Sequence, residues 1–393
     1  MMKRSITINS VAVTGSFIGI ISLLPGWITL KPNRLVEGTP LNVWEGAGWT
    51  GATVIASLWI LCLILSLVPR KKLSGILLGI TANTLLILTL VCVAMASRSL
   101  LAGAAGPVRV SLGIGFWTGI AAIYTVIFAA RQQLSDRSVF RGVVSWSGLV
   151  IFAVLLFSGF FNYLSVLQEF AGYKQRFLQE LLKHISLFSG TVAVASIIGI
   201  LLGILATKNS YIARPIFFFT NIMQTIPGLA LFGLLIAPLS ALSFAFPVLR
   251  DVGIRGVGVA PAAITLIIYA LLPIVRNTYV GMKQVATDAI NAGMGMGMSR
   301  WQLFRRVEVP LASPLILEGI RMASIQAIGL TAIAALIGAG GLGWFVFRGI
   351  GQAAPDLIIL GAIPIIVLAL LVDAIMRTII KLGTPRGLVL ESR

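Results

Sequence analysis

Residues 291–310, NAGMGMGMSRWQLFRRVEVP, form a polar stretch punctuated by glycines in a chain that is otherwise a succession of apolar segments. The neighbouring segments are apolar enough to lie in a membrane, so we expect this stretch to lie in water. Its glycines permit tight turns or the close approach of another backbone. Four large apolar side chains form one edge of a predicted short helix: Met296, Met298, Trp301 and Phe304. The stretch predicts an ordered docking element that Pro310 ends before the next apolar segment.

The composition is typical of a membrane protein. Hydrophobic residues make up 58% of the 393 residues, charged residues 11%, and the mean hydropathy is +1.00. A soluble domain of this length could not bury so much apolar surface in one core. The formal charge of +18 is spread over single Lys and Arg residues at the ends of apolar segments, which favours topology signals and lipid contacts over nucleic-acid binding. Cys62 and Cys92 lie inside apolar runs and indicate neither a disulfide framework nor a metal site.

Ten apolar runs are long enough to cross about 30 Å of hydrocarbon as helices. The chain is therefore predicted to be an all-α, polytopic membrane protein. The first run lacks a small-residue cleavage pattern, so we expect it to be a retained span and not a removed signal peptide. The predicted spans are about 8–28, 51–69, 73–96, 110–130, 142–163, 185–206, 216–238, 260–280, 313–337 and 356–378.

The distribution of basic residues predicts the orientation. With residue 1 inside, 20 of the 30 Lys and Arg residues fall on the cytoplasmic side, which satisfies the positive-inside rule. Both termini and the stretch 291–310 are then cytoplasmic. The twenty are Lys3, Arg4, Arg70, Lys71, Lys72, Arg131, Arg137, Arg141, Lys208, Arg214, Arg276, Lys283, Arg300, Arg305, Arg306, Arg321, Arg377, Lys381, Arg386 and Arg393.

We predict a domain boundary near residue 164. Five spans with weakly featured connections precede it, so residues 1–164 read as an amino-terminal extension and 165–393 as the functional domain. The segment LQEFAGYKQRFLQELLKHI that follows the boundary mixes charges with apolar residues at helical spacing. This pattern predicts an interfacial helix along the outer membrane surface.

The stretch 291–310 resembles the cytoplasmic coupling loop of ABC importer permeases. That pattern is EAA, three residues, Gly, nine residues, then an aliphatic residue, any residue, Leu and Pro. The spacing is kept in full, although Asn291 replaces the leading Glu and Gly293 the second Ala. The resemblance implies that residues 286–310 bind a separate ATPase subunit. The residues that carry this role are Asn291, Ala292, Gly293, Gly297, Met298, Arg300, Trp301, Val309 and Pro310.

Five stretches occur in the order found in permeases of osmoprotectant importers. They are QTIPGLALFGLL (224–235), YALLPIVRNTYVGMKQV (269–285), the coupling stretch, GIRMA (319–323) and AALIGAGGLG (334–343). The extension resembles that of YehY-type permeases. The resemblance implies a type I ABC importer permease of the bacterial inner membrane for glycine betaine, carnitine, choline or a related quaternary amine. It also implies an ATPase, a second permease subunit and a periplasmic binding protein as partners.

Two further groups are candidates for the translocation path. Gln224, Thr225 and Pro227 lie within an apolar run, where a proline kinks a helix and polar groups face a cavity or another helix. They line the path in one interpretation and pack helix against helix in the other. A second group lies at the outer end of a span, as a gate or as a simple helix end: Gly338, Gly340, Gly341 and Gly343.

Charged residues within the spans suggest structural pairs. Glu318 and Arg321 are three apart on a predicted helix, and Asp373 and Arg377 are four apart, so each pair can form a salt bridge. His184, the single histidine, lies at a membrane boundary and is more often structural than a ligand.

The chain lacks the sequence patterns of an enzyme. It has no G-x-x-x-x-G-K-[ST] phosphate loop and no metal or acid–base cluster, so no cofactor is expected and the energy must come from another subunit. Three alternatives remain: a permease for an amino acid such as methionine, a secondary transporter, and a membrane-embedded enzyme.

Overall fold

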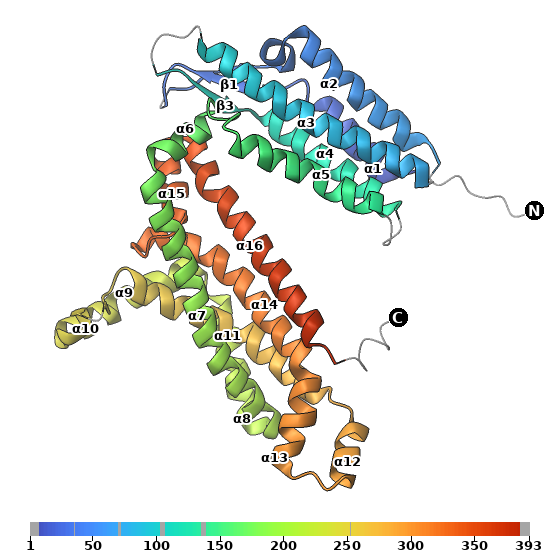
Figure 1. Cartoon of the computed structure of the whole chain (residues 1–393). Coiled ribbons are helices and arrows are strands. Elements are labelled where there is room, and N and C mark those ends of the chain that lie inside the picture. Colours follow the sequence, from blue (N-terminus) through green and yellow to red (C-terminus); the bar gives the residue numbers. More distant parts are fainter. Residues whose placement is uncertain are drawn as a thin grey trace, which may run out of the picture. The chain divides into compact units, whose positions relative to one another are not determined.

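The computed structural model describes residues 8–34, 36–69, 72–102, 107–134, 139–251 and 253–385 (Figure 1). It divides into two compact units, Met1–Gly172 and Tyr173–Arg393. Nine helices in the described ranges are long and apolar enough to cross a membrane. The predicted all-α membrane fold is confirmed.

Seven of the basic residues assigned to the cytoplasmic side lie outside the described residues: Lys3, Arg4, Arg70, Lys71, Arg137, Arg386 and Arg393.

The first unit is a helical bundle with a small antiparallel sheet of strand order β2-β1-β3. Its helices are α1 (Ser10–Ile21), α2 (Val43–Leu67), α3 (Lys72–Ala102), α4 (Ile114–Gln132), α5 (Val139–Phe157) and α6 (Ser165–Gly172). Its strands are β1 (Ile28–Lys31), β2 (Thr39–Leu41) and β3 (Arg109–Leu112). No sequence pattern indicated this sheet, because its strands are only three or four residues long.

Close helix contacts and buried polar pairs hold the first unit together. A Cβ on Gly19 would lie 2.2 Å from the ring of Trp59, so the glycine lets α1 and α2 approach. The Asn83 side chain on α3 is buried and donates to the carbonyl of Val144 on α5 at 3.0 Å. Inside a membrane such a polar group needs a partner, and this bond supplies one.

The expected span at 8–28 is wrong in its length. The helix α1 has 12 residues, about 18 Å, and the chain then turns into β1. Apolar composition alone did not distinguish a spanning helix from a short helix followed by a strand. The run predicted at 216–238 is also not one helix, because it breaks between α8 and α9 at Ile226 and Pro227.

The second unit is built around a central helix, α11, which packs against α7, α8, α9 and α14. Its elements are α7 (Lys174–Lys208), α8 (Ser210–Thr225), α9 (Gly228–Ala245), α10 (Val248–Asp251), α11 (Val259–Lys283), α12 (Thr287–Gly295), α13 (Arg300–Leu303), a π-helix (Phe304–Glu308), α14 (Val309–Ala334), a 3-10 helix (Ala335–Ile337), α15 (Gly343–Gly351) and α16 (Pro355–Gly383). The predicted interfacial helix is split by Tyr173. Its second half is continuous with the spanning part of α7.

Small residues allow the central helices to touch. Gly199 and Gly203, four apart on α7, face α11, where added Cβ atoms would lie 2.8 Å from Ile274 and 2.6 Å from Thr278. On the other side, a Cβ at Gly319 of α14 would lie 2.8 Å from the carbonyl of Pro273. Interfaces of small residues are a common way to pack helices in lipid. Apolar side chains gain little free energy by exchanging lipid contacts for protein contacts, so close van der Waals packing becomes important.

Candidate functional site: a coupling segment, a clamp and a glycine turn

The stretch 291–310 forms a helix, a turn and a second helix at one end of the second unit (Figure 1). Asn291, Ala292 and Gly293 lie on α12, and Gly297 lies in the turn. The helix α13 begins with a capping box, in which Ser299 and Gln302 each accept a hydrogen bond from the other's backbone N–H. The free N–H groups at the start of α13 thus find partners within the segment, which favours an ordered turn.

The end of α12 is closed by a Schellman motif. The N–H of Met298 donates to the carbonyl of Gly293 at 3.2 Å, and the N–H of Gly297 donates to that of Met294 at 2.9 Å. Gly297 has a φ of +75°, the left-handed conformation that this motif requires. The glycine with a close neighbour within the chain is instead Gly293, where a Cβ would lie 2.6 Å from Leu303. The two glycines therefore have different physical roles.

The outer surface of this coupling segment (residues 286–310) is apolar and basic. Met294, Met296 and Trp301 expose 54%, 70% and 65% of their surface, and the Trp301 ring stacks on Phe304 with centroids 5.6 Å apart. Arg300 is exposed beside them. Exposed apolar groups of this kind are found where a surface meets another protein or a membrane.

The expectation that Pro310 ends the segment is wrong. The chain passes from α13 through the π-helix directly into α14, with Val309 as its first residue and Pro310 in its first turn. The N–H of Val309 bonds the carbonyl of Phe304, five residues back, so the wider π-helical turn directly precedes the proline, which has no N–H of its own. The segment is therefore continuous with a long helix that spans the unit.

Gln224 and Pro227 belong to a clamp between α8, α9 and α11. The chain breaks at Ile226, whose carbonyl accepts a hydrogen bond from the hydroxyl of Tyr269 on α11. In return, the Gln224 side chain donates to the carbonyl of Tyr269 at 2.7 Å. That carbonyl is free because Pro273, four residues on, has no N–H to offer it. Pro273 and the break at Ile226 thus each leave a carbonyl without a helical partner, and two side chains satisfy them.

Thr225 is not part of this clamp. Its side chain is exposed and its hydroxyl donates to the carbonyl of Ile222 in its own helix at 2.7 Å. The structure therefore separates the three candidates of this group. Gln224 and the Pro227 break connect two helices, whereas Thr225 faces away.

The four candidate gate glycines form a turn that is held by α7. Gly338, Gly340 and Gly341 have φ values of +81°, +79° and +91°. Gly343 begins α15, and a Cβ there would lie 1.8 Å from the carbonyl of Ala332. This turn, residues 338–343, needs glycine at each of these positions for conformation or for space.

Two side chains of α7 bind the backbone of this turn. The Glu180 carboxylate accepts a hydrogen bond from the N–H of Gly341 at 2.6 Å, and Nδ1 of His184 accepts one from the N–H of Leu342 at 3.3 Å. Glu180 is fully buried and is also paired with Arg176 at 2.8 Å and Lys183 at 3.3 Å. A buried carboxylate is stable only when it has such partners.

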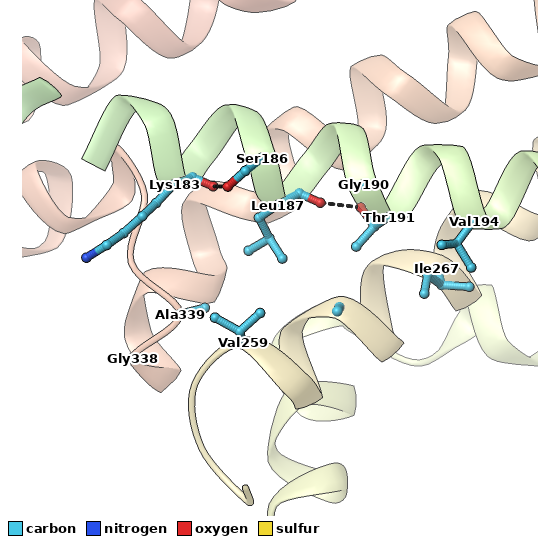
Figure 2. A pocket seen from close by; sticks show the side chains of 11 residues that line it. Lys183, Ser186, Leu187, Gly190, Thr191, Val194, Val259, Ile267, Gly338 and Ala339 are labelled. Atoms are coloured by element: carbon cyan, nitrogen blue, oxygen red, sulfur yellow. Dashed lines mark hydrogen bonds between the residues drawn. The ribbon is translucent and has the colours of Figure 1, made fainter. Parts of the chain in front are cut away.

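A pocket of about 540 Å³ opens beside the turn (Figure 2). Side chains from α7 line one wall and those from the start of α11 line the other, with Gly338 and Ala339 at one edge. Thr191 and Ser186 contribute hydroxyls, but both donate to carbonyls of α7. The lining is otherwise mostly apolar, apart from Lys183.

The predicted salt bridges are present and are joined to each other. Arg321 binds Glu318 at 2.6 Å, and Arg377 binds Asp373 at 2.8 Å. Arg321 also pairs with Asp373, which links α14 to α16. The sequence spacing indicated the pairs within each helix, but not this connection between helices.

Sequence reasoning missed Glu180 and Tyr269. A signal for each was available: Glu180 and His184 are four apart, and so are Tyr269 and Pro273. Spacing of four places two side chains on one helix face, or a proline opposite a carbonyl. Neither spacing, however, predicts which distant segment the residue contacts.

Comparison with known proteins identifies the family. The chain matches the family described as "ABC transporter permease YehY, N-terminal domain" over residues 9–167 and that described as "Binding-protein-dependent transport system inner membrane component" over residues 195–382. The osmoprotectant import permease protein OsmW of Salmonella typhimurium is 40% identical over 206 residues, which cover 52% of this chain and 91% of that protein.

Two further proteins are similar to this chain over about the same share of its length. The glycine betaine/carnitine/choline transport system permease protein OpuCB of Bacillus subtilis is 37% identical over 206 residues, 52% of this chain and 88% of that protein. Among solved structures, an inward-facing MetNI methionine ABC transporter matches with a TM-score of 0.46 at 21% identity, covering 53% of this chain and 96% of that chain. The chain belongs to the inner-membrane permease components of binding-protein-dependent ABC transporters, with a YehY-type domain at its amino-terminal side.

Proposed function

We propose that this permease imports a quaternary amine osmoprotectant of the glycine betaine, carnitine or choline class. The support comes from relatives at 36–40% identity that are named for these solutes. The quaternary ammonium group of such solutes is bound by aromatic cages, which we expect mainly in the binding protein that delivers the solute. An amino acid such as methionine is the alternative substrate.

The coupling segment carries the mechanistic part of this proposal. It is ordered by its own caps, exposes Met294, Met296 and Trp301, and is continuous with α14. The helix α14 has 26 residues, about 39 Å, and leads from the coupling segment to the glycine turn. A continuous helix of this length would connect a movement of the coupling segment with the glycine turn.

The partners follow from this arrangement. A separate cytoplasmic ATPase would bind Asn291, Ala292, Gly297, Met298 and Arg300 and supply the energy, because the chain has no phosphate loop. A second permease subunit would complete the path, and a periplasmic binding protein would dock near the glycine turn. Membrane lipids surround the spans, and nucleic acid has no role.

The orientation is part of the same proposal. The coupling segment and both termini would be cytoplasmic, as the distribution of basic residues predicts. The glycine turn, at the opposite end of α14, would then face the periplasm, where it would form a gate. Gln224 and Pro227 would hold a bent helix on the translocation path.

The amino-terminal extension, residues 1–164, would be an appended module. All the groups named for coupling, clamp and gate come after it. We assign it to assembly or regulation and not to the path.

Co-expression with the cognate ATPase tests the coupling. The complex should co-purify, and the isolated chain should hydrolyse no ATP. Trp301→Ala should reduce co-purification at least ten-fold, since truncation of an exposed aromatic anchor costs about 2 kcal/mol or more. Trp49→Ala, at a 76% exposed tryptophan of the extension, is the matched control and should bind normally. Unchanged binding of the Trp301 variant would exclude this surface as the ATPase contact.

Uptake into proteoliposomes tests the substrate. With the ATPase and binding protein present, labelled glycine betaine should accumulate on ATP addition, and excess choline or carnitine should compete. Competition by methionine alone would support the alternative substrate. Accumulation driven by an ion gradient without ATP would contradict the ABC mechanism.

A further inference from the structure

A second pocket lies at the same end of the second unit as the coupling segment. Its volume is about 660 Å³, and it is formed where α7 ends, α8 begins and α11 ends. Lys283, the last residue of α11, lines it and precedes α12 by only three connecting residues. The pocket is therefore at the membrane boundary on the coupling side.

The rim of this pocket is strongly basic. Lys208, Arg214 and Lys283 line it, and none of its lining residues is acidic. Within the described part of the chain, none of the three cations forms a salt bridge. Three cations without a counter-charge around one cavity attract an anion.

Helix capping explains only part of this arrangement. Lys208 and Lys283 lie in the last turns of α7 and α11, where a cation stabilises the negative end of the helix dipole. Arg214 does not fit this explanation, because it lies near the start of α8, at the positive end of that helix. Its place on the rim agrees instead with the positive-inside distribution, which also favours contact with anionic lipid.

The wall of the pocket combines an apolar part with the polar residues Thr207, Asn209 and Ser210. Ala206 and Ala213 are 2% and 8% exposed, and Phe217 packs edge-on against Tyr279 at 5.2 Å. Phe218 is 69% exposed beside them. A free phosphate would use only the basic rim, whereas a ligand with a charged head and an apolar chain would use both rim and wall.

We propose that this pocket binds the phosphate headgroup of an anionic phospholipid, with its acyl chain along Phe217 and Phe218. Basic pockets between membrane helices are a recurring way to hold such headgroups. The assignment to the inner leaflet rests on the proposed orientation of the coupling segment. A lipid bound here would contact both α8 and α11, the two helices that the Gln224–Tyr269 clamp joins.

Binding of defined lipids to the purified full-length chain tests the proposal. Native mass spectrometry in detergent would compare dioleoyl phosphatidylglycerol with dioleoyl phosphatidylcholine. The triple variant Lys208→Gln, Arg214→Gln, Lys283→Gln should bind phosphatidylglycerol about 100-fold more weakly, since each cation near a membrane contributes about a five-fold factor. The charge-matched control Arg305→Gln, Arg306→Gln, Lys381→Gln removes three exposed cations outside the pocket and should bind like the wild type.

Each outcome decides the proposal. Equal loss in both triple variants, or no loss in the pocket variant, would overturn it. Displacement of the lipid by glycerol phosphate at equal concentration would overturn the lipid assignment in favour of a soluble phosphate. The three side chains are exposed, so single variants should fold and each should lose about five-fold, which keeps the test valid if the triple variant aggregates. This assay needs no ATPase, so its failure is distinct from a failure of coupling.

Discussion

At the scale of single residues, Gly297 has a requirement that its neighbour Gly295 does not have. Gly297 adopts φ +75° to close the Schellman motif, whereas Gly295 is the last residue of α12, with open space where a Cβ would lie and a φ outside the left-handed range. Gly297→Ala should therefore strain the turn by about 1–2 kcal/mol, while Gly295→Ala should be neutral or slightly stabilising.

The measurement for these two variants is ATPase co-purification at matched expression, with solute uptake as a second readout. We expect Gly297→Ala to weaken both and Gly295→Ala to leave both unchanged. Gly297→Asn should be intermediate, because asparagine tolerates the left-handed region better than alanine does. Equal behaviour of the two alanine variants would show that the turn conformation does not matter for coupling.

The clamp gives a second prediction at the residue scale. Gln224→Leu leaves the Tyr269 carbonyl without a donor and should lower stability by about 1–3 kcal/mol. In a Pro273→Ala background the new N–H can bond this carbonyl within α11, so the same change should cost clearly less. Thermal unfolding of the four proteins in detergent measures the interaction between the two sites. If Gln224→Leu lowers the free energy of unfolding equally in both backgrounds, Gln224 does not compensate for the N–H that Pro273 lacks.

At the scale of elements, α7 holds the glycine turn through side chains and not through apolar packing alone. Glu180→Ala removes the acceptor for the N–H of Gly341. A lost bond of about 1–3 kcal/mol should raise amide exchange in residues 338–343 by roughly 5- to 150-fold. Gln179→Ala, one position away and exposed, is the control and should leave exchange unchanged. Exchange in the Glu180 variant equal to that of the control would contradict the tether.

The elements also show how far sequence patterns reach. Long apolar runs and the polar stretch 291–310 predicted most spans and the coupling segment, because a membrane demands such lengths of apolar residues. Boundaries inside apolar sequence were less predictable. The short α1 and the break at Ile226 lie in runs that read as ordinary spans, because short helices, strands and spans share one apolar composition there.

At the scale of the whole molecule, the division near residue 164 remains a prediction that truncation can test. A chain that begins at residue 165 should insert and still bind the ATPase, because every group assigned to coupling lies beyond this point. Uptake should fall or lose its regulation, since we assign the extension to assembly or regulation. ATPase co-purification beside uptake is the measurement. Loss of co-purification by a correctly inserted fragment would place the extension in the structural core.

Local composition and the spacing of residues along one helix were enough to predict a helical membrane protein, the place of its polar segment and the residue pairs that share a helix face. Contacts between segments that are distant in the sequence came from the three-dimensional packing alone: Gln224 contacts Tyr269, Glu180 contacts Gly341 and Arg321 contacts Asp373. Helices in a membrane are apolar on faces that meet lipid and on faces that meet protein. Hydrophobic periodicity therefore cannot predict which face of one helix contacts another. The small residues at the helix crossings determine that packing.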